Sequence, residues 1–136
     1  MGFLDELEWV YKGFYEKGKL TEAKKRFARV ISNGLRGEAN SEELALGYVF
    51  ISTVSCELGE LEDVLLCCEE GLKLTEANRL RARLYLNMSY ALGKQGRVEE
   101  ALSVAESAIV TAEKAGIDEV LKTARKNYAE LQRPID

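Results

Sequence analysis

The sequence predicts an all-α protein made of repeated helix pairs, and three observations indicate that fold class. Three stretches align around one glycine each: GKLTEAKKRF from Gly18, GELEDVLLCC from Gly59 and GRVEEALSVA from Gly96. Apolar residues recur three and four positions apart on both sides of these glycines, which is the spacing of one helix face. The single proline of the chain is Pro134, so the interior contains no obligatory helix breaker.

The first helix pair is expected over residues 4–36. Its apolar positions are Leu7, Val10, Phe14, Ala23, Phe27, Val30 and Ile31. Because glycine has no Cβ, Gly18 can end the first helix of this pair in the left-handed conformation, as can the two glycines that align with it. Gly34 and Gly37 are candidate ends of the second helix.

The second and third pairs are expected over residues 41–74 and 78–112. Asn40 with Glu43 three residues later has the spacing of a capping box, which predicts a helix start there. Thr75 is expected to cap the helix that follows it. The apolar face of the second pair contains Tyr48, Ile51, Ser55, Val64, Cys68 and Leu72, and that of the third contains Tyr85, Met88, Leu92, Leu102, Ala105, Ala108 and Ile109.

A last helix is expected over residues 118–132, after Gly116 ends the one before. One of its faces carries Val120, Leu121, Ala124, Tyr128 and Leu131, and the other carries Lys122, Arg125, Lys126 and Glu130. A terminal helix with a polar outer face closes the exposed end of a stack of repeats. This helix is therefore predicted to cap the stack.

The third copy, RARLYLNMSYALGKQGRVEEALSVAESAIVTA, resembles a tetratricopeptide repeat. It has the aromatic residue Tyr85, Asn-Met-Ser in place of the usual Asn-Leu-Gly, the Lys-Gln-Gly turn, Glu-Glu-Ala-Leu, and the pair Ala108-Ile109. The resemblance implies one domain over residues 1–136, folded as a right-handed α-solenoid of three antiparallel helix pairs plus a C-terminal capping helix. The copies start 41 and 37 residues apart, which exceeds the family period of about 34, so the helices or joints are expected to be extended.

The resemblance also implies a function. Members of this family bind extended or helical peptides in a concave groove lined by the first helix of each pair, so this chain is expected to be a non-catalytic module with a protein or peptide partner. The positions that the resemblance assigns to the groove are Trp9, Lys12, Tyr15, Glu16, Val49, Phe50, Thr53, Glu57, Arg83, Leu86, Asn87, Tyr90 and Lys94.

Two alternatives remain open from the sequence. Trp9 and Phe50 could pack between neighbouring repeats instead of facing a ligand. The chain could also be a self-associating scaffold, such as a homodimer, that uses the apolar groove or an end face of the stack, because an exposed apolar patch marks interfaces of either kind.

Several classes of chemistry are disfavoured. The chain has no histidine, which removes the commonest general base and metal ligand. The stretch from Gly13 to Thr21 resembles a phosphate-binding loop, but Leu20 replaces its Ser or Thr and a helical pattern precedes it. The three cysteines do not have the four-ligand pattern of structural zinc. We therefore expect no enzyme activity, no cofactor and no metal.

The charge and hydropathy of the chain limit its partners and its location. A net charge of −4 with mixed acids and bases argues against a nucleic-acid binder. No apolar run reaches the length of a membrane span, and the N-terminus lacks the basic residues of a secretory signal. Three cysteines in such a chain fit a reducing compartment. The prediction is a cytoplasmic protein without nucleic-acid or membrane partners.

Overall fold

The computed structural model describes residues 1–37 and 39–133, and all regular structure in these ranges is helical, which confirms the all-α class. Pro134 lies outside the described residues. The elements follow in the order α1 (Phe3–Val10), η1 (Tyr11–Tyr15), α2 (Leu20–Arg36), α3 (Ser41–Leu58), α4 (Leu61–Leu74), α5 (Asn78–Lys94), α6 (Val98–Ala115) and α7 (Asp118–Leu131). None of the described helices has the length and apolar character needed to cross a membrane.

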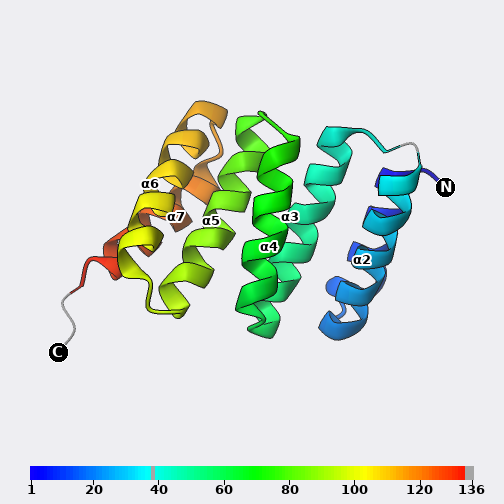
Figure 1. Ribbon diagram of the computed structural model, residues 1–136, viewed down its shortest axis with the longest axis horizontal. Coiled ribbons are helices and arrows are strands. Elements are labelled where there is room, and N and C mark those ends of the chain that lie inside the picture. Colours follow the sequence, from blue (N-terminus) through cyan, green and yellow to red (C-terminus); the bar gives the residue numbers. More distant parts are fainter. Residues whose placement is uncertain (38, 134–136) are drawn as a thin grey trace.

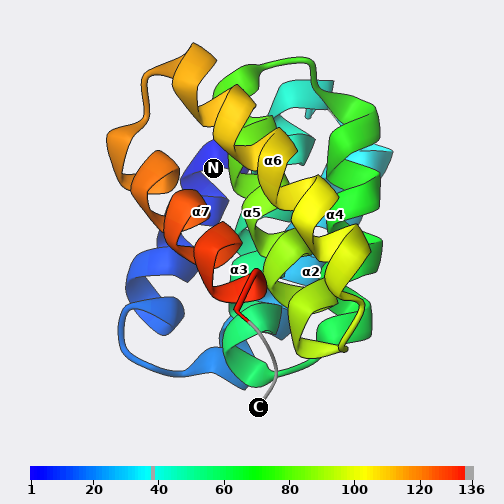
Figure 2. The same ribbon diagram turned by 90° about the vertical axis from the view of Figure 1, so that its left-hand side faces the viewer.

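The helices follow one another along the long axis of the molecule, with α2 at one end and α6 and α7 at the other (Figure 1). Each helix packs on the next, and α1, α3, α5 and α7 also pack on one another in that order. They form one layer, called here the inner layer together with η1. The outer layer consists of α2, α4 and α6. Figure 2 shows α7 and the N-terminal helix on one side of the molecule and α6 and α4 on the other.

Glycines in the left-handed conformation end the first helix of every pair, as the sequence predicts. Gly18, Gly59 and Gly96 have φ angles of 76°, 73° and 78°, and Gly116 before α7 has 68°. An L-residue with a Cβ disfavours this region, whereas glycine enters it freely. The turn between the helices of each pair is therefore specified by one residue.

The predicted capping box at the start of α3 is confirmed. The Asn40 side chain accepts a hydrogen bond from the Glu43 amide at 2.9 Å, and the Glu43 carboxylate accepts one from the Asn40 amide at 3.0 Å. Thr75 does not begin the next helix. It is the C-cap of α4, its Oγ1 accepts from the Ala77 amide at 3.0 Å, and α5 begins only at Asn78.

Gly34 does not end α2, because the helix continues to Arg36. Its role is to allow close packing: a Cβ at this position would lie 2.7 Å from the Phe3 ring of α1. Gly37 is the C-cap of α2, as the sequence allows. Glycine is favoured both at the end of a helix and where two helices approach closely, because each position favours the absence of a side chain. The sequence pattern therefore does not distinguish these two roles at Gly34.

The first helix of the first pair is shorter and less regular than the sequence predicts. After α1 the chain forms a single π-helical segment, η1, which contains Gly13. Its wider turn is visible in the hydrogen bond from the Glu16 amide to the Tyr11 carbonyl, five residues back, at 2.8 Å. The rings of Tyr11 and Tyr15 consequently stack with their centroids 5.1 Å apart.

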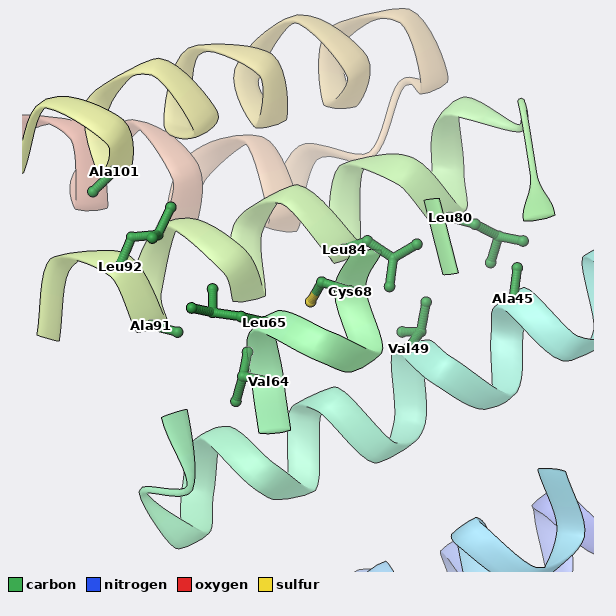
Figure 3. Packing of buried hydrophobic residues seen from close by; sticks show 10 residues of the cluster. All are labelled: Ala45, Val49, Val64, Leu65, Cys68, Leu80, Leu84, Ala91, Leu92 and Ala101. Carbon is green, nitrogen blue, oxygen red and sulfur yellow. The ribbon is translucent and has the colours of Figure 1, made fainter. Parts of the chain in front are cut away.

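Two large hydrophobic clusters and a smaller one form the core, and the smaller one joins α5, α6 and α7 through Ala82, Ala112 and Val120. The first joins α1, α2 and α3 through Leu7, Val10, Ala23, Phe27, Val30, Ile31, Leu44, Ile51 and Val54. The second joins α3 to α6 through Ala45, Val49, Val64, Leu65, Cys68, Leu80, Leu84, Ala91, Leu92 and Ala101 (Figure 3). Apolar positions three and four apart on each helix are the ones buried, as an amphipathic pattern requires.

Candidate functional site

A hollow of about 470 Å³ opens on the inner layer where α3, α5 and α7 meet. We call it the inner hollow. Each of the three helices contributes residues from one face. They are Thr53, Cys56 and Glu57 from α3, Leu86, Asn87 and Tyr90 from α5, and Thr123, Lys126, Asn127 and Glu130 from α7.

Asn87 is fixed in this hollow by the neighbouring helix. Its Nδ2 donates to Ser52 Oγ at 2.9 Å and to Thr53 Oγ1 at 3.1 Å. Both hydroxyls in turn donate to the Val49 carbonyl of α3, at 3.0 and 2.9 Å. The two hydrogen bonds that Nδ2 donates therefore fix the orientation of the Asn87 side-chain amide. No hydrogen bond to Asn87 Oδ1 is found among the described residues, so this oxygen can accept one from a ligand.

The same contact recurs one helix further on. Asn127 of α7 donates through Nδ2 to Ser89 Oγ of α5 at 2.7 Å, and Ser89 donates to the Leu86 carbonyl at 2.9 Å. Ser52 and Ser89 are both fully buried. Each buried serine oxygen thus accepts a hydrogen bond from an asparagine of the neighbouring helix. The Oδ1 atoms of the two asparagines lie on adjacent helices of the hollow.

Between η1 and α3, a contact between aromatic rings replaces the asparagine–serine hydrogen bond. Phe50, which aligns with Asn87 in the repeat, lies 5.5 Å from the Tyr11 ring and 5.4 Å from the Phe27 ring, centroid to centroid. Phe27 belongs to the cluster that joins α1, α2 and α3, and the partly buried Tyr11 and Phe50 pack against it. Packing between neighbouring repeats, the alternative left open for Phe50, is what the structure shows.

Tyr15 closes the inner layer toward the N-terminus. Its hydroxyl donates to Glu57 Oε1 at 2.5 Å, which joins η1 to the last turn of α3. Burial and then the Glu57 carboxylate raise the pKa of Tyr15, so the phenol stays protonated at neutral pH and remains a donor. One carboxylate at the edge of the hollow is thereby held in place.

Charges of both signs surround the hollow. Lys126 and Glu130 of α7 lie in its wall with Glu57 of α3. Lys94, one turn beyond Tyr90 on α5, places its Nζ 5.6 Å from the centroid of the Tyr90 ring. Tyr90 is 39% exposed, so its ring offers an open aromatic surface between the charged groups.

The structure brings together five of the thirteen residues assigned to the groove: Thr53, Glu57, Leu86, Asn87 and Tyr90. Tyr15 and Lys94 contact members of this set. Glu16 is exposed and Arg83 half-buried, and neither lines the inner hollow.

The other assigned residues lie outside the inner hollow, and among them Val49 is corrected from an exposed to a buried position. Val49 is 6% exposed and belongs to the core, because the start of α5 covers it with Leu80 and Leu84 (Figure 3). Trp9 and Lys12 border hollows at the N-terminal end of the stack, and Lys12 pairs with Glu8 at 2.6 Å.

Helix α7 contributes to the inner hollow, and the sequence pattern of the three copies does not predict this contribution. Four residues of α7 line it, although this helix was predicted only to cap the stack. A signal was present: Thr123, Lys126, Asn127 and Glu130 each follow Arg83, Leu86, Asn87 and Tyr90 by the same 40 residues. The last helix therefore occupies the position of a further first helix.

The thiols offer no nucleophile. Burial raises the pKa of Cys56 and Cys68 from the ordinary 9.0 to about 12, and that of Cys67 to about 11. A thiol with such a pKa is protonated at neutral pH, whereas the thiolate is the reactive form. Within residues 1–37 and 39–133, no three His, Cys, Asp or Glu side chains are grouped as metal ligands.

Comparison with known proteins finds no protein-family model that matches this chain. No curated protein matches it either.

Proposed function

We propose that this chain is a non-catalytic protein-interaction module of the tetratricopeptide type, a right-handed α-solenoid that binds a segment of a partner protein in the inner hollow. The layered packing of α1, α3, α5 and α7 against α2, α4 and α6 supports that architecture. The observation that carries the proposal is the convergence of Asn87, Tyr90 and Asn127 from adjacent helices on one open hollow.

The two asparagines favour an extended peptide over a helical one. Their Nδ2 groups are engaged by Ser52, Thr53 and Ser89, which leaves the Oδ1 atoms to accept hydrogen bonds. An extended chain presents free backbone N–H groups to such acceptors, whereas a helix uses most of its own internally. The ligand is thus a short extended segment whose amides donate to Asn87 and Asn127.

Leu86 and Tyr90 supply the apolar contact. Both border the hollow beside the asparagines, and an aromatic ring gives a large contact area at small cost in conformational entropy. Lys126 in the wall of the hollow and Lys94 beside Tyr90 attract acidic groups of the ligand, and Glu57 and Glu130 attract basic ones. The ligand class is an extended peptide with an apolar anchor and charges of both signs.

Selection from a library of random linear peptides tests this proposal. Wild-type protein should enrich peptides that bind with micromolar dissociation constants, about −8 kcal/mol in binding free energy. Tyr90→Ala should weaken the selected peptides at least about tenfold, which corresponds to roughly 1.4 kcal/mol. Val110→Ala, an exposed apolar residue of α6, is the matched control and should leave binding unchanged.

Circular dichroism must show that both variants keep the helix content of the wild type. The proposal is wrong if selection enriches no peptide, or if folded Tyr90→Ala binds the selected peptides as tightly as the wild type does.

A further inference from the structure

The two ends of the helical stack differ. At the C-terminal end α7 covers α5 and α6 and turns the exposed residues Lys122 and Arg125 outward. At the N-terminal end α1 and α2 pack on α3 from one side only. A stack of repeats requires a polar cap or a partner at each end, because the stacking surface of a repeat is apolar.

Trp9 is the main apolar feature of this N-terminal end face, and half of its surface is exposed. The residue is held in one orientation. The Arg26 guanidinium lies 5.4 Å from the Trp9 ring and 4.3 Å from the Phe14 ring, and the two rings meet edge to face at 5.4 Å. An exposed aromatic side chain that is already ordered loses little conformational entropy when a partner covers it.

On this face, exposed side chains lie beside hollows. Trp9 and Met1 stand between two hollows, one of about 470 Å³ on the α1–η1 side and one of about 220 Å³ between α1 and α2. A knob beside a hollow on the same surface fits a second copy related by a two-fold axis, since each knob then enters the hollow of the other. The residues of the smaller hollow are Met1, Glu6, Trp9, Val10, Arg26, Arg29, Val30 and Asn33.

The charges of the N-terminal end face would also be complementary between two copies related by a two-fold axis. Helix α1 contains three acidic residues and no basic one, whereas α2 contains five basic residues and one acidic residue. Lys24 is directed away, to Asp63 and Glu60 of α4. Within the described part of the chain, Glu6 and Arg29 form no ion pair. A two-fold axis places the acidic edge of each α1 against the basic edge of the other copy's α2.

We propose that a second copy of this chain covers the N-terminal end face, in a two-fold dimer in which Trp9 of each copy fills the hollow between α1 and α2 of the other. The inner hollow lies on α3, α5 and α7 and stays open in this arrangement. The dimer therefore carries two peptide sites. A partner with two copies of the recognised segment would bind it more tightly than a single segment does.

Sedimentation velocity from about 1 to about 100 μM, where micromolar dimers change state, tests the dimer with the whole chain. The wild type should approach twice the single-chain mass of 15.2 kDa as concentration rises. Arg29→Glu and Glu6→Lys should each weaken association at least about tenfold, because each places like charges in contact. Lys114→Glu on α6 makes the same change of charge as Arg29→Glu at a distant exposed site and should leave association unchanged.

An equimolar mixture of Arg29→Glu and Glu6→Lys gives the sharper result. In the mixed dimer, one Glu6–Arg29 contact keeps its natural charges and the other has both charges reversed. Both contacts then join opposite charges, so association should return. Trp9→Glu, with its helix content checked, should abolish the dimer and leave peptide binding in the inner hollow intact. A wild type that is monomeric throughout, a dimer that persists in Arg29→Glu, or a mixture that stays monomeric would each overturn the proposal.

Discussion

At the scale of single residues, the buried serines Ser52 and Ser89 connect neighbouring helices of the inner layer, whereas the buried Ser55 hydroxyl has no hydrogen-bond partner among the described residues. Ser52 accepts a hydrogen bond from Asn87 and Ser89 accepts one from Asn127, so two successive helix contacts use the same pair of residue types. A buried hydroxyl without a partner costs free energy, and the asparagine removes that cost. The same side chains then offer their free oxygens to the hollow, so stability and binding depend on the same residues.

Ser89 and Asn127 should therefore be coupled energetically. Ser89→Ala and Asn127→Ala should each lower the free energy of unfolding by about 1 kcal/mol. The double variant should lose less than the sum, with a coupling of about 0.5 kcal/mol or more. Urea denaturation measures all four proteins of the cycle, and Ser103→Ala on the exposed face of α6 serves as the control. Strict additivity would show that the contact contributes nothing.

Phe50 and Tyr90 separate packing from binding. Phe50 stacks on Phe27 and also contacts Tyr11, so Phe50→Ala should lower the free energy of unfolding by about 2–3 kcal/mol, through lost burial and ring contacts. Tyr90→Ala should cost less than about 1 kcal/mol, because much of its ring is already exposed. Urea denaturation compares the two directly. Equal losses would contradict the assignment of Phe50 to the core.

At the scale of the elements, one glycine conformation defines each pair. Gly59 ends α3 with a φ of 73°, and the chain turns from there into α4. A sequence pattern finds such a position reliably because only glycine adopts it without cost. Gly34 shows where that inference fails: a helix that must approach an aromatic ring also requires glycine, and sequence alone does not separate the two roles.

Gly59→Ala and Gly13→Ala form a matched pair of substitutions. Gly59→Ala should lower the free energy of unfolding by about 1–2 kcal/mol, since alanine is disfavoured in the left-handed region. Gly13 is helical and a Cβ there would contact nothing within 4 Å, so Gly13→Ala should be neutral or stabilise by up to about 1 kcal/mol. Thermal or urea unfolding checks both, and a loss of stability in Gly13→Ala as large as that in Gly59→Ala would contradict this account.

The sequence predicts which face of each helix points toward the site, but the neighbouring helix decides which residues of that face stay exposed. Thr53 and Val49 lie one turn apart on α3 and carry the same expectation of exposure. Val49 is nevertheless buried under Leu80 and Leu84, whereas Thr53 reaches the hollow. Periodicity identifies the face of a helix, but the way the next helix crosses it decides which turns of that face remain open. The π-helical segment η1 is unpredicted for a similar reason, because Tyr11 and Tyr15 contact Phe50 and Glu57 of α3, which local sequence does not reveal.

At the scale of the whole molecule, the helices that line the inner hollow (α3, α5 and α7) and those that form the N-terminal end face (α1 and α2) lie at different places along the stack (Figure 1). The hollow depends on α7, which supplies Lys126 and Asn127 and resembles a further first helix by its spacing from α5. The end face depends on α1 and α2 alone. A substitution at one place should therefore leave the other intact, so the proposed peptide binding and the proposed self-association should be separable by mutation.

The most direct measurement of the central claim is the map of amide chemical-shift changes when a selected peptide is titrated into the ¹⁵N-labelled protein. If the peptide binds in the inner hollow, we expect the largest changes on residues of α3, α5 and α7 around it, including the side-chain amides of Asn87 and Asn127. Changes confined to the outer layer, α2, α4 and α6, would contradict it, as would a peptide that shifts Asn87 and Asn127 no more than the exposed residues of α6.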